Sequence, residues 1–472
     1  MGEENLEFNS LIFITIFFPI LAISYFFIKD NLKNLWLLIF GFIFYAWGSL
    51  EGLCIIIILA LTNYAIGLLI FHRKSNKWLL ALGVVINVLS LGYFKYTNFF
   101  IENINAVFGS DISALNILVP LGISFFVFKA ISYLVDVYNN KVEAERNLID
   151  FLLFMTFFSQ VLSGPIVRYV DMKEELKNRS VNGDDIRYGL MRFVIGLAKK
   201  VFIANNLGIL ADSIWGISTH EMTAAVAWIG SLAYTLQIYF DFSGYSDMAI
   251  GLARVFGFRF KENFDYPYIS RSITEFWRRW HISLSSWFRD YIYIPLGGSR
   301  TGNVYFNIFV VFLVTGIWHG SAWNFVIWGL WNGFFNIIEK FLGSKGYKVG
   351  AGNIVQKAIA YIYTMFVVNM GWVFFRAPGL KHACSYILSM FGLNDLSAVG
   401  YTAGWYLTKF NIVLLIVAII FSVPILKNLY KKYVKETVGS IAVENVILII
   451  LMGICIMGVV SSSYNSFIYF QF

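Results

Sequence analysis

Long apolar stretches, separated by shorter polar segments, recur along the whole chain. An α-helix needs roughly 20 predominantly apolar residues to cross the hydrocarbon core of a bilayer, and these stretches approach or reach that length. The pattern therefore predicts an all-α polytopic membrane protein with about 11 transmembrane helices. The clearest apolar stretches span residues 11–28, 53–71, 78–94, 361–375, 411–423 and 446–460.

The composition supports this interpretation. The 472 residues are 58% hydrophobic and only 14% charged, whereas a soluble domain usually carries about 25% charged residues. No internal repeat or soluble appendage is evident, so we expect a single membrane domain over residues 1–472. The first apolar stretch follows acidic rather than basic residues, which favours a first transmembrane helix over a cleaved signal peptide.

The formal net charge of +8 comes from segments that border the apolar stretches. Cytoplasmic loops are enriched in Lys and Arg, which explains this charge better than binding to nucleic acid does. We expect both termini on the extracytoplasmic side of a multi-pass protein. The basic segments that should face the cytoplasm span residues 72–77, 168–200, 254–300, 345–357 and 427–435.

Two segments do not fit a simple series of spans. Residues 151–162 are apolar, yet the segments on both sides look cytoplasmic. Either this segment is re-entrant, which requires surrounding protein or a water-filled cavity, or one flank is misassigned. Residues 240–300 are too polar for lipid and too aromatic for a free loop, so we expect them to pack into the protein and line a cavity.

Two histidines, His281 and His319, are the most informative polar residues. An ionisable side chain at membrane depth is costly and marks a functional site by default. Imidazole is also suited to proton transfer near neutral pH. The alternative is that His319 only hydrogen-bonds another helix and that His281 only shapes a cavity. The three cysteines are isolated, so we expect neither a metal site nor a cysteine nucleophile.

Four motifs follow one another through the central part of the chain. They read SGPIVRY at 163–169, YFDFSGYSDMAIG at 239–251, FWRRWHISLSSWFRDYIYIPLGGSR at 276–300 and WHG at 318–320. Together they resemble the signature of the membrane-bound O-acyltransferase (MBOAT) family. The third motif resembles the alginate O-acetylase branch in particular. The related teichoic-acid D-alanyl transfer proteins share the Trp-x-Arg-Trp-His pattern.

The resemblance implies a helical bundle with re-entrant segments around a central tunnel, and a catalytic region at about residues 160–335. It also implies transfer of an acyl group from a cytoplasmic thioester donor to a hydroxyl. His319 matches the family's invariant histidine, and His281 matches the second histidine of the polysaccharide-acylating branch. A hydroxyl that attacks a thioester must lose a proton, and a histidine within hydrogen-bond reach can accept it.

We expect His319 to be the general base and His281 to shape or polarise the donor end of the tunnel. If the helix continues through His319, Thr315 and Trp323 lie one turn to either side of it. In the same way, Trp277 and Ser285 would flank His281. Tryptophan walls would exclude water from the thioester.

Other side chains in these motifs are candidates for donor or substrate binding. Arginine recognises phosphate through its planar fork, so the arginines either bind donor phosphates or anchor the cytoplasmic interface. Asp241 either orients a partner or belongs to a structural ion pair, and we favour the ion pair. The full set of binding candidates is Trp277, Arg278, Arg279, Arg289, Trp318 and Asp241.

The chain ends in Phe-Ile-Tyr-Phe-Gln-Phe. Such rings are typical of interfacial anchors. The ending also resembles an aromatic motif of polysaccharide-acylating relatives or their small partner peptides, in which a tyrosine carries the acyl group. A phenol has a pKa of about 10, so its ester retains much of the transfer potential of a thioester. Tyr469 is therefore a candidate acyl carrier.

The leading hypothesis is an enzyme, an O-acetyltransferase of the bacterial cytoplasmic membrane. It would use acetyl-CoA as a substrate rather than a bound cofactor, and serve an exopolysaccharide or cell-wall polymer together with an extracytoplasmic esterase-like partner. The alternative enzyme transfers D-alanine from an acyl carrier protein to teichoic acid. A proton-coupled transporter would also place histidines in a cavity, but such proteins often show two related halves.

Overall fold

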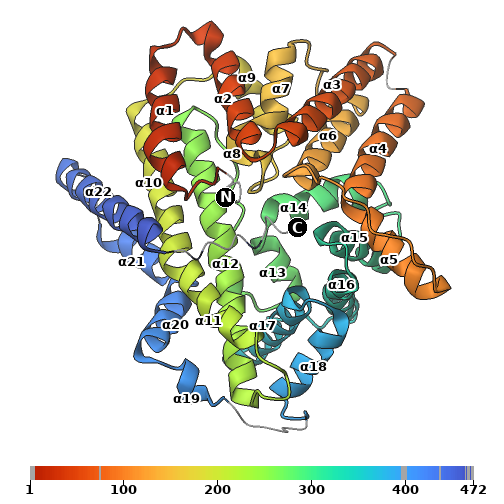
Figure 1. Cartoon of the computed structure of the whole chain (residues 1–472), viewed down its shortest axis with the longest axis vertical. Helices are drawn as coiled ribbons and strands as arrows, with labels where there is room; N and C mark the ends of the chain where they lie inside the picture. The colour runs from red at the N-terminus through yellow and green to blue at the C-terminus, as the bar shows by residue number, and fades with distance from the viewer. Residues whose placement is uncertain are drawn as a thin grey trace. The chain divides into compact units, whose positions relative to one another are not determined.

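The computed structural model describes residues 6–73, 76–394, 401–434, 437–462, 464 and 468. In this part of the chain the regular structure is helical, and the β-type pairing is an isolated bridge between Met222 and Tyr401. Figure 1 shows the helices, coloured from red at the N-terminus to blue at the C-terminus. The all-α membrane fold expected from the sequence is confirmed.

The chain divides into two compact units. The first comprises Met1–Phe193 and Tyr245–Glu262, and the second comprises Val194–Gly244 and Asn263–Phe472. Two of the three boundaries fall inside helices, α10 (Gly183–Ala198) and α12 (Ala224–Val255), and the third, between Glu262 and Asn263, lies outside the helices. A single membrane domain over residues 1–472 stays a prediction.

The first unit is built on aromatic packing. Phe13 stacks on Phe17 with ring centroids 5.4 Å apart, and both rings contact Phe44 and Phe158. Its helices are η1 (Phe13–Phe17), α1 (Phe18–Phe27), η2 (Asp30–Leu32), α2 (Lys33–Gly48), α3 (Leu50–His72), α4 (Lys77–Leu91), η3 (Gly92–Tyr96), α5 (Thr97–Phe108), α6 (Ile123–Tyr138), α7 (Leu148–Thr156), α8 (Phe158–Val161) and α9 (Tyr169–Lys177).

The second unit holds both histidines, and its core is a cluster of buried aliphatic and aromatic side chains. Its helices besides parts of α10 and α12 are η4 (Lys199–Ala204), α11 (Asn205–Trp215), η5 (Pro267–Ile269), α13 (Ile273–Arg279), α14 (Ile282–Phe288), η6 (Arg289–Tyr293), α15 (Val304–His319), α16 (Trp323–Ser344), α17 (Ile354–Arg376), α18 (Leu380–Met390), α19 (Ala403–Tyr406), α20 (Lys409–Phe421), α21 (Ile425–Tyr433) and α22 (Val438–Ser461).

Helices α15 and α16 form a closely packed hairpin in this unit. A Cβ on Gly329 would lie 2.4 Å from the carbonyl oxygen of Phe312, and one on Gly316 would lie 2.5 Å from that of Phe325. Helix α15 begins at an N-cap, Asn303, whose side chain accepts hydrogen bonds from two backbone N–H groups of the first turn. The glycines thus allow the backbones to approach where α15 ends in His319.

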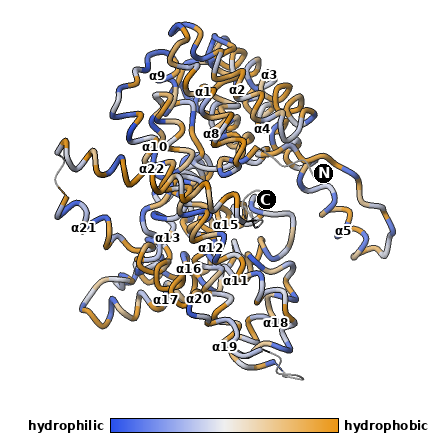
Figure 2. Tube along the Cα trace, turned by 60° about the vertical axis from the view of Figure 1, so that its left-hand side comes forward, coloured by the Kyte–Doolittle hydropathy of each residue, from blue (hydrophilic) through white to orange (hydrophobic). Residues whose placement is uncertain are grey.

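Five described helical segments are long and apolar enough to cross a membrane, and a sixth is possible if the bent pair α20–α21 is one span. The six apolar stretches singled out in the sequence are mostly helical, although residues 28 and 422–423 lie beyond the helix ends. Figure 2 shows hydrophobic residues along α3 and α17. The count of about 11 spans stays a prediction.

Residues 151–162 form two short buried helices, α7 and α8, separated at Phe157. The nine residues of α7 rise only about 14 Å, less than half of a hydrocarbon core. Both helices are too short to span a bilayer, and this is the property expected of a re-entrant segment. Residues 240–300 behave as predicted, because their second half packs into the second unit and lines a cavity there.

Candidate active site

His281 lies at a break between two short helices. Helix α13 ends at Arg279, Trp280 is extended, and His281 adopts a left-handed conformation with φ 43° and ψ 57° before α14 begins. Histidine is among the residues that tolerate this region better than most. The backbone of the break is held by Asn263, whose carbonyl oxygen accepts from the N–H of Ile282 at 2.9 Å. The break turns the imidazole into the protein, where it is fully buried.

The side chain of Asn263 fixes the tautomer of His281. The Oδ1 atom of Asn263 accepts from the backbone N–H of Ser283 at 3.2 Å and from the Ser283 hydroxyl at 2.8 Å. These donors identify that atom as oxygen, so Nδ1 of His281, 3.1 Å away, must carry a proton. The neutral ring therefore presents a lone pair at Nε2, which has no hydrogen-bond partner among the described residues.

The surroundings of His281 are aromatic. The ring of Phe242 meets the imidazole edge to face at 4.7 Å, and Phe264 lies nearly parallel at 6.5 Å. Burial lowers the pKa of His281 to about 3, because the charged form loses its hydration. The imidazole is thus neutral near physiological pH. In this state the buried Nε2 atom can accept a hydrogen bond but cannot donate one to a carbonyl.

His319 occupies the last position of α15 and is 2% exposed. Three rings surround it in edge-to-face geometry, Trp318 and Trp328 at 4.8 Å and Phe375 at 5.2 Å. Gly320 is extended and ends the helix. Carbonyl groups at a helix C-terminus favour a positive charge nearby. The three rings therefore exclude water from the imidazole. The end of the helix favours a positive charge on the ring when it accepts a proton.

This helix end corrects one expectation. Thr315 lies one turn before His319 on α15, as predicted, but Trp323 begins the next helix and is 55% exposed. The prediction that Trp323 flanks His319 is wrong because the helix stops at Gly320. Likewise, Trp277 and Ser285 lie on separate helices on either side of the break at His281.

A chain of tryptophans connects the two histidines. Trp280, next to His281, packs on Trp372 at 4.8 Å, and Trp372 packs on Trp328 at 5.9 Å. Trp328 in turn contacts the ring of His319. Both histidines thus lie in one continuous aromatic core of the second unit.

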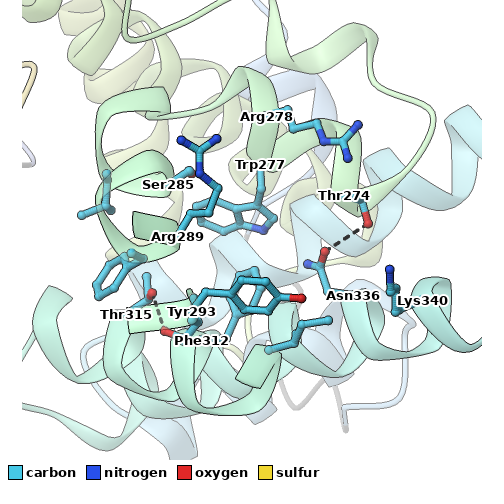
Figure 3. Close-up of a pocket in the computed structure, with 14 residues that line it drawn as sticks. Thr274, Trp277, Arg278, Ser285, Arg289, Tyr293, Phe312, Thr315, Asn336 and Lys340 are labelled. Atoms are coloured by element: carbon cyan, nitrogen blue, oxygen red, sulfur yellow. Dashed lines mark hydrogen bonds between the residues drawn. The ribbon is translucent and has the colours of Figure 1, made fainter. Parts of the chain in front are cut away.

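A cavity of about 300 Å³ lies beside this core. Figure 3 shows its lining, with Trp277 and Phe312 among the apolar walls and Arg278 and Arg289 at the upper side. Thr315, four residues before His319, also faces it. Neither histidine lines the cavity itself.

Cationic groups gather where this cavity adjoins a larger one of about 1280 Å³, which shares Thr274, Arg278 and Lys340 with it. Within the described part of the chain, Arg278 and Lys340 have no ion-pair partner. Arg289 also lines the smaller cavity, and it pairs with Asp290 at 2.7 Å. Arg279 lines the larger cavity and forms ion pairs with carboxylates at 3.0 Å. The arrangement suits a ligand with a polyanionic end and an apolar end.

The remaining predicted residues lie elsewhere. Trp318 is buried against His319. Asp241 lies in the core and pairs with Lys200 at 2.6 Å, and both side chains are at most 1% exposed. Tyr469 falls outside the described residues. The functional roles of these side chains stay predictions.

Sequence reasoning missed two groups of residues. Asn263 orients His281 from 18 positions earlier, and no motif spacing indicates that contact. Trp328 and Phe375 enclose His319 from α16 and α17, where they read as ordinary core residues. The polar Asn263 in an aromatic segment was the one available signal.

Comparison with known proteins identifies the family. The family model for MBOAT, the membrane-bound O-acyltransferase family, matches residues 119–345. A probable alginate O-acetylase of Pseudomonas putida is 43% identical over 415 residues, which cover 86% of this chain and 82% of that protein.

Two further relatives have other printed activities. The peptidoglycan O-acetyltransferase of Helicobacter pylori is 34% identical over 520 aligned residues, covering 99% of this chain and 98% of that protein. The teichoic acid D-alanyltransferase of Bacillus subtilis is 30% identical over 287 residues, covering 57% and 71%. This chain, an O-acyltransferase with several apolar membrane helices, belongs to the membrane-bound O-acyltransferase family.

Proposed function

We propose that this O-acyltransferase takes acetyl from acetyl-CoA on the cytoplasmic side and delivers it outward for O-acetylation of an exopolysaccharide or cell-wall polymer. One observation carries the proposal. Two buried histidines share an aromatic core beside a cavity with cations at its rim. The names of the P. putida and H. pylori relatives favour acetyl as the group transferred.

His319 is the general base in this proposal. An acceptor hydroxyl attacks the thioester carbonyl, its proton passes to the imidazole, and the tetrahedral intermediate collapses by expelling the CoA thiolate. The thiolate takes up that proton, so the base is regenerated. The position of His319 at a helix C-terminus supports the role, because the carbonyl dipoles stabilise the imidazolium.

His281 serves as a hydrogen-bond acceptor for the hydroxyl. Because Nδ1–H is held by Asn263, the lone pair at Nε2 is available to a hydroxyl. This tautomer fits hydroxyl orientation better than the polarisation of a thioester carbonyl, which needs an N–H donor. His281 then holds the acceptor hydroxyl as it arrives, and the same proton turns to His319, which removes it as the hydroxyl oxygen attacks the thioester.

The role of Asn263 leads to a first prediction. Asn263→Ala removes three hydrogen bonds to the His281 segment and frees the ring to change tautomer. We expect the rate of acetyl transfer to fall about 10- to 100-fold, as for other partners that fix a histidine ring. Asn428→Ala, at an exposed position on α21, is the matched control. An unchanged rate in Asn263→Ala would show that acetyl transfer does not depend on the tautomer of His281 that Asn263 holds.

The cationic rim leads to a second prediction. The double substitution Arg278→Gln, Lys340→Gln should raise the KM for acetyl-CoA about tenfold, or about 1.4 kcal/mol, with little change in kcat. The effect should shrink at high salt, because exposed charges are screened. Lys427→Gln, Lys431→Gln on α21 is the charge-matched control. An equal rise of KM in that control would assign the effect to net charge.

The same chemistry leads to a proposal for the location of the enzyme and for its partner. We place the enzyme in the bacterial cytoplasmic membrane with both termini outside, supported by the distribution of Lys and Arg. Tyr469 accepts the acetyl group as a phenyl ester, and an extracytoplasmic esterase-like partner passes it to the polymer.

D-Alanyl transfer from a carrier protein is the second candidate, favoured by the B. subtilis relative. Purified protein offered labelled acetyl-CoA and labelled D-alanyl carrier protein in parallel separates the two. We expect loss of the acyl group from acetyl-CoA alone. Consumption of the carrier-bound D-alanine, with acetyl-CoA left intact, would replace the proposed donor.

A further inference from the structure

The C-terminal segment is tied into the core of the second unit at Ile468. The Ile468 side chain is 7% exposed and belongs to the main buried cluster. Its backbone N–H donates to Oδ2 of Asp241 at 2.9 Å. The other oxygen of Asp241 accepts from Lys200 at 2.6 Å. The carboxylate therefore joins an ion pair on one side and the tail on the other.

A second anchor lies four residues earlier, at Tyr464. Its hydroxyl donates to Oδ2 of Asp212 at 2.6 Å, and the other oxygen of Asp212 pairs with Arg376 at 2.5 Å. Asn205 donates to the Tyr464 carbonyl at 3.2 Å. Gly208 leaves room for the phenol, because a Cβ there would lie 2.5 Å from its oxygen.

The two anchors adjoin the rings that contact the histidines. Asp241 precedes Phe242, which packs against His281 at 4.7 Å. Arg376, which holds Asp212, follows Phe375, which packs against His319 at 5.2 Å. Consecutive Cα atoms are only about 3.8 Å apart. Tyr464 and Ile468 are thus both bound in the part of the second unit that surrounds the histidines.

The energetics of Asp241 support a specific role. A buried ion pair often gives no net stability, because the desolvation of two charges offsets their attraction. Here the carboxylate also makes a charge-assisted hydrogen bond to a backbone N–H of the tail, a type roughly twice as strong as a neutral one. Asp241 therefore connects α12 to η4 through Lys200 and also binds the C-terminal segment at Ile468.

We propose that Asp241 and Asp212 are positioning residues that dock the C-terminal segment at the acyl-transfer site. Docking of Tyr464 and Ile468 is required for delivery of the acetyl group to the polymer. This inference rests on the proposed function for its chemistry. The docking itself is testable without any turnover.

Docking is tested by thiol labelling. In a background with Cys54, Cys384 and Cys455 replaced by alanine, Ile468→Cys should react with a water-soluble maleimide at least tenfold more slowly than exposed Ser462→Cys. Three further changes should each restore fast labelling of Ile468→Cys. They are Tyr464→Phe, Gly208→Ala and the double change Lys200→Met, Asp241→Leu. The double change removes both charges, so no unpaired charge remains buried.

The same three changes, made in the parent chain, test the positioning role. We expect polymer acetylation to fall at least tenfold in kcat while the KM for acetyl-CoA stays the same, since the donor cavity is untouched. Equal labelling of Ile468→Cys and Ser462→Cys would overturn the docking. Fast labelling with unchanged polymer acetylation would overturn the positioning role. Failure of the parent protein to consume acetyl-CoA would instead contradict the proposed function.

Discussion

His319→Ala is expected to lower kcat/KM for acetyl transfer by about 10³-fold, within the range of 10² to 10⁴ contributed by a positioned general base. The imidazole is buried among Trp318, Trp328 and Phe375, so solvent cannot take over its role as base. The measurement is CoA release by purified protein in detergent, supplied with the partner protein and the polymer as acceptor, at several acetyl-CoA concentrations. The loss should appear in kcat more than in KM, because the base acts in the transition state.

Folding must be separated from chemistry in this variant. The alanine leaves a cavity in an aromatic core, so His319→Gln, which keeps polar volume but supplies no imidazole, should show a similar loss of rate. His72→Ala, at an exposed helix end, is the matched control and should keep full activity. Wild-type rates in both His319 variants, with normal membrane insertion, would exclude His319 as the base.

Tyr469→Phe is expected to abolish polymer acetylation while the protein folds and inserts normally. The change removes one oxygen atom, the proposed carrier of the acetyl group, and keeps the ring that an interfacial anchor would use. Ile468, its neighbour, stays tied to Asp241 through a backbone N–H that the substitution does not alter. Acetyl content of the polymer, measured in cells by release of acetate with base, reports the result.

Tyr433→Phe is the matched control, because Tyr433 is 69% exposed on α21. It should leave acetylation unchanged. Full polymer acetylation in Tyr469→Phe would show that the tail is an anchor and that the acetyl group reaches the partner by another route.

The sequence predicted much of the fold and the identity of the two histidines. Long apolar stretches are typical of membrane helices. Five of the six stretches singled out coincide with candidate spans, counting the bent pair α20–α21, whereas residues 11–28 form a shorter apolar helix and the candidate span Gly183–Trp215 was not singled out. The motifs around His281 and His319 carry enough residues to indicate the family. These features depend on local composition, which a single sequence displays.

The arrangement of the site could not be predicted in the same way. Helical periodicity assigned Trp323 to the face of His319, but the chain leaves the helix at Gly320 and Trp328 fills that position. The left-handed His281 depends on Asn263, which reaches it through tertiary folding. Long-range polar contacts of this kind leave no periodic signal.

The tail shows the same limit. Its aromatic residues favour either an anchor or a carrier, and no pattern in the chain indicates Asp241 as its binding partner. The favoured interpretation of Asp241 as a member of an ion pair agrees with its contact to Lys200. Its second contact, to Ile468, joins residues 227 positions apart.

The most direct measurement follows one acetyl group through a single turnover. Purified protein is mixed with labelled acetyl-CoA, the partner protein and the polymer. The reaction is quenched at short times, and the protein is then separated from the partner and the polymer. We expect label on the C-terminal peptide of the wild-type protein before any reaches the polymer, and no label on His319→Ala. Label that reaches the polymer without passing through the protein, or equal labelling of His319→Ala, would contradict the account.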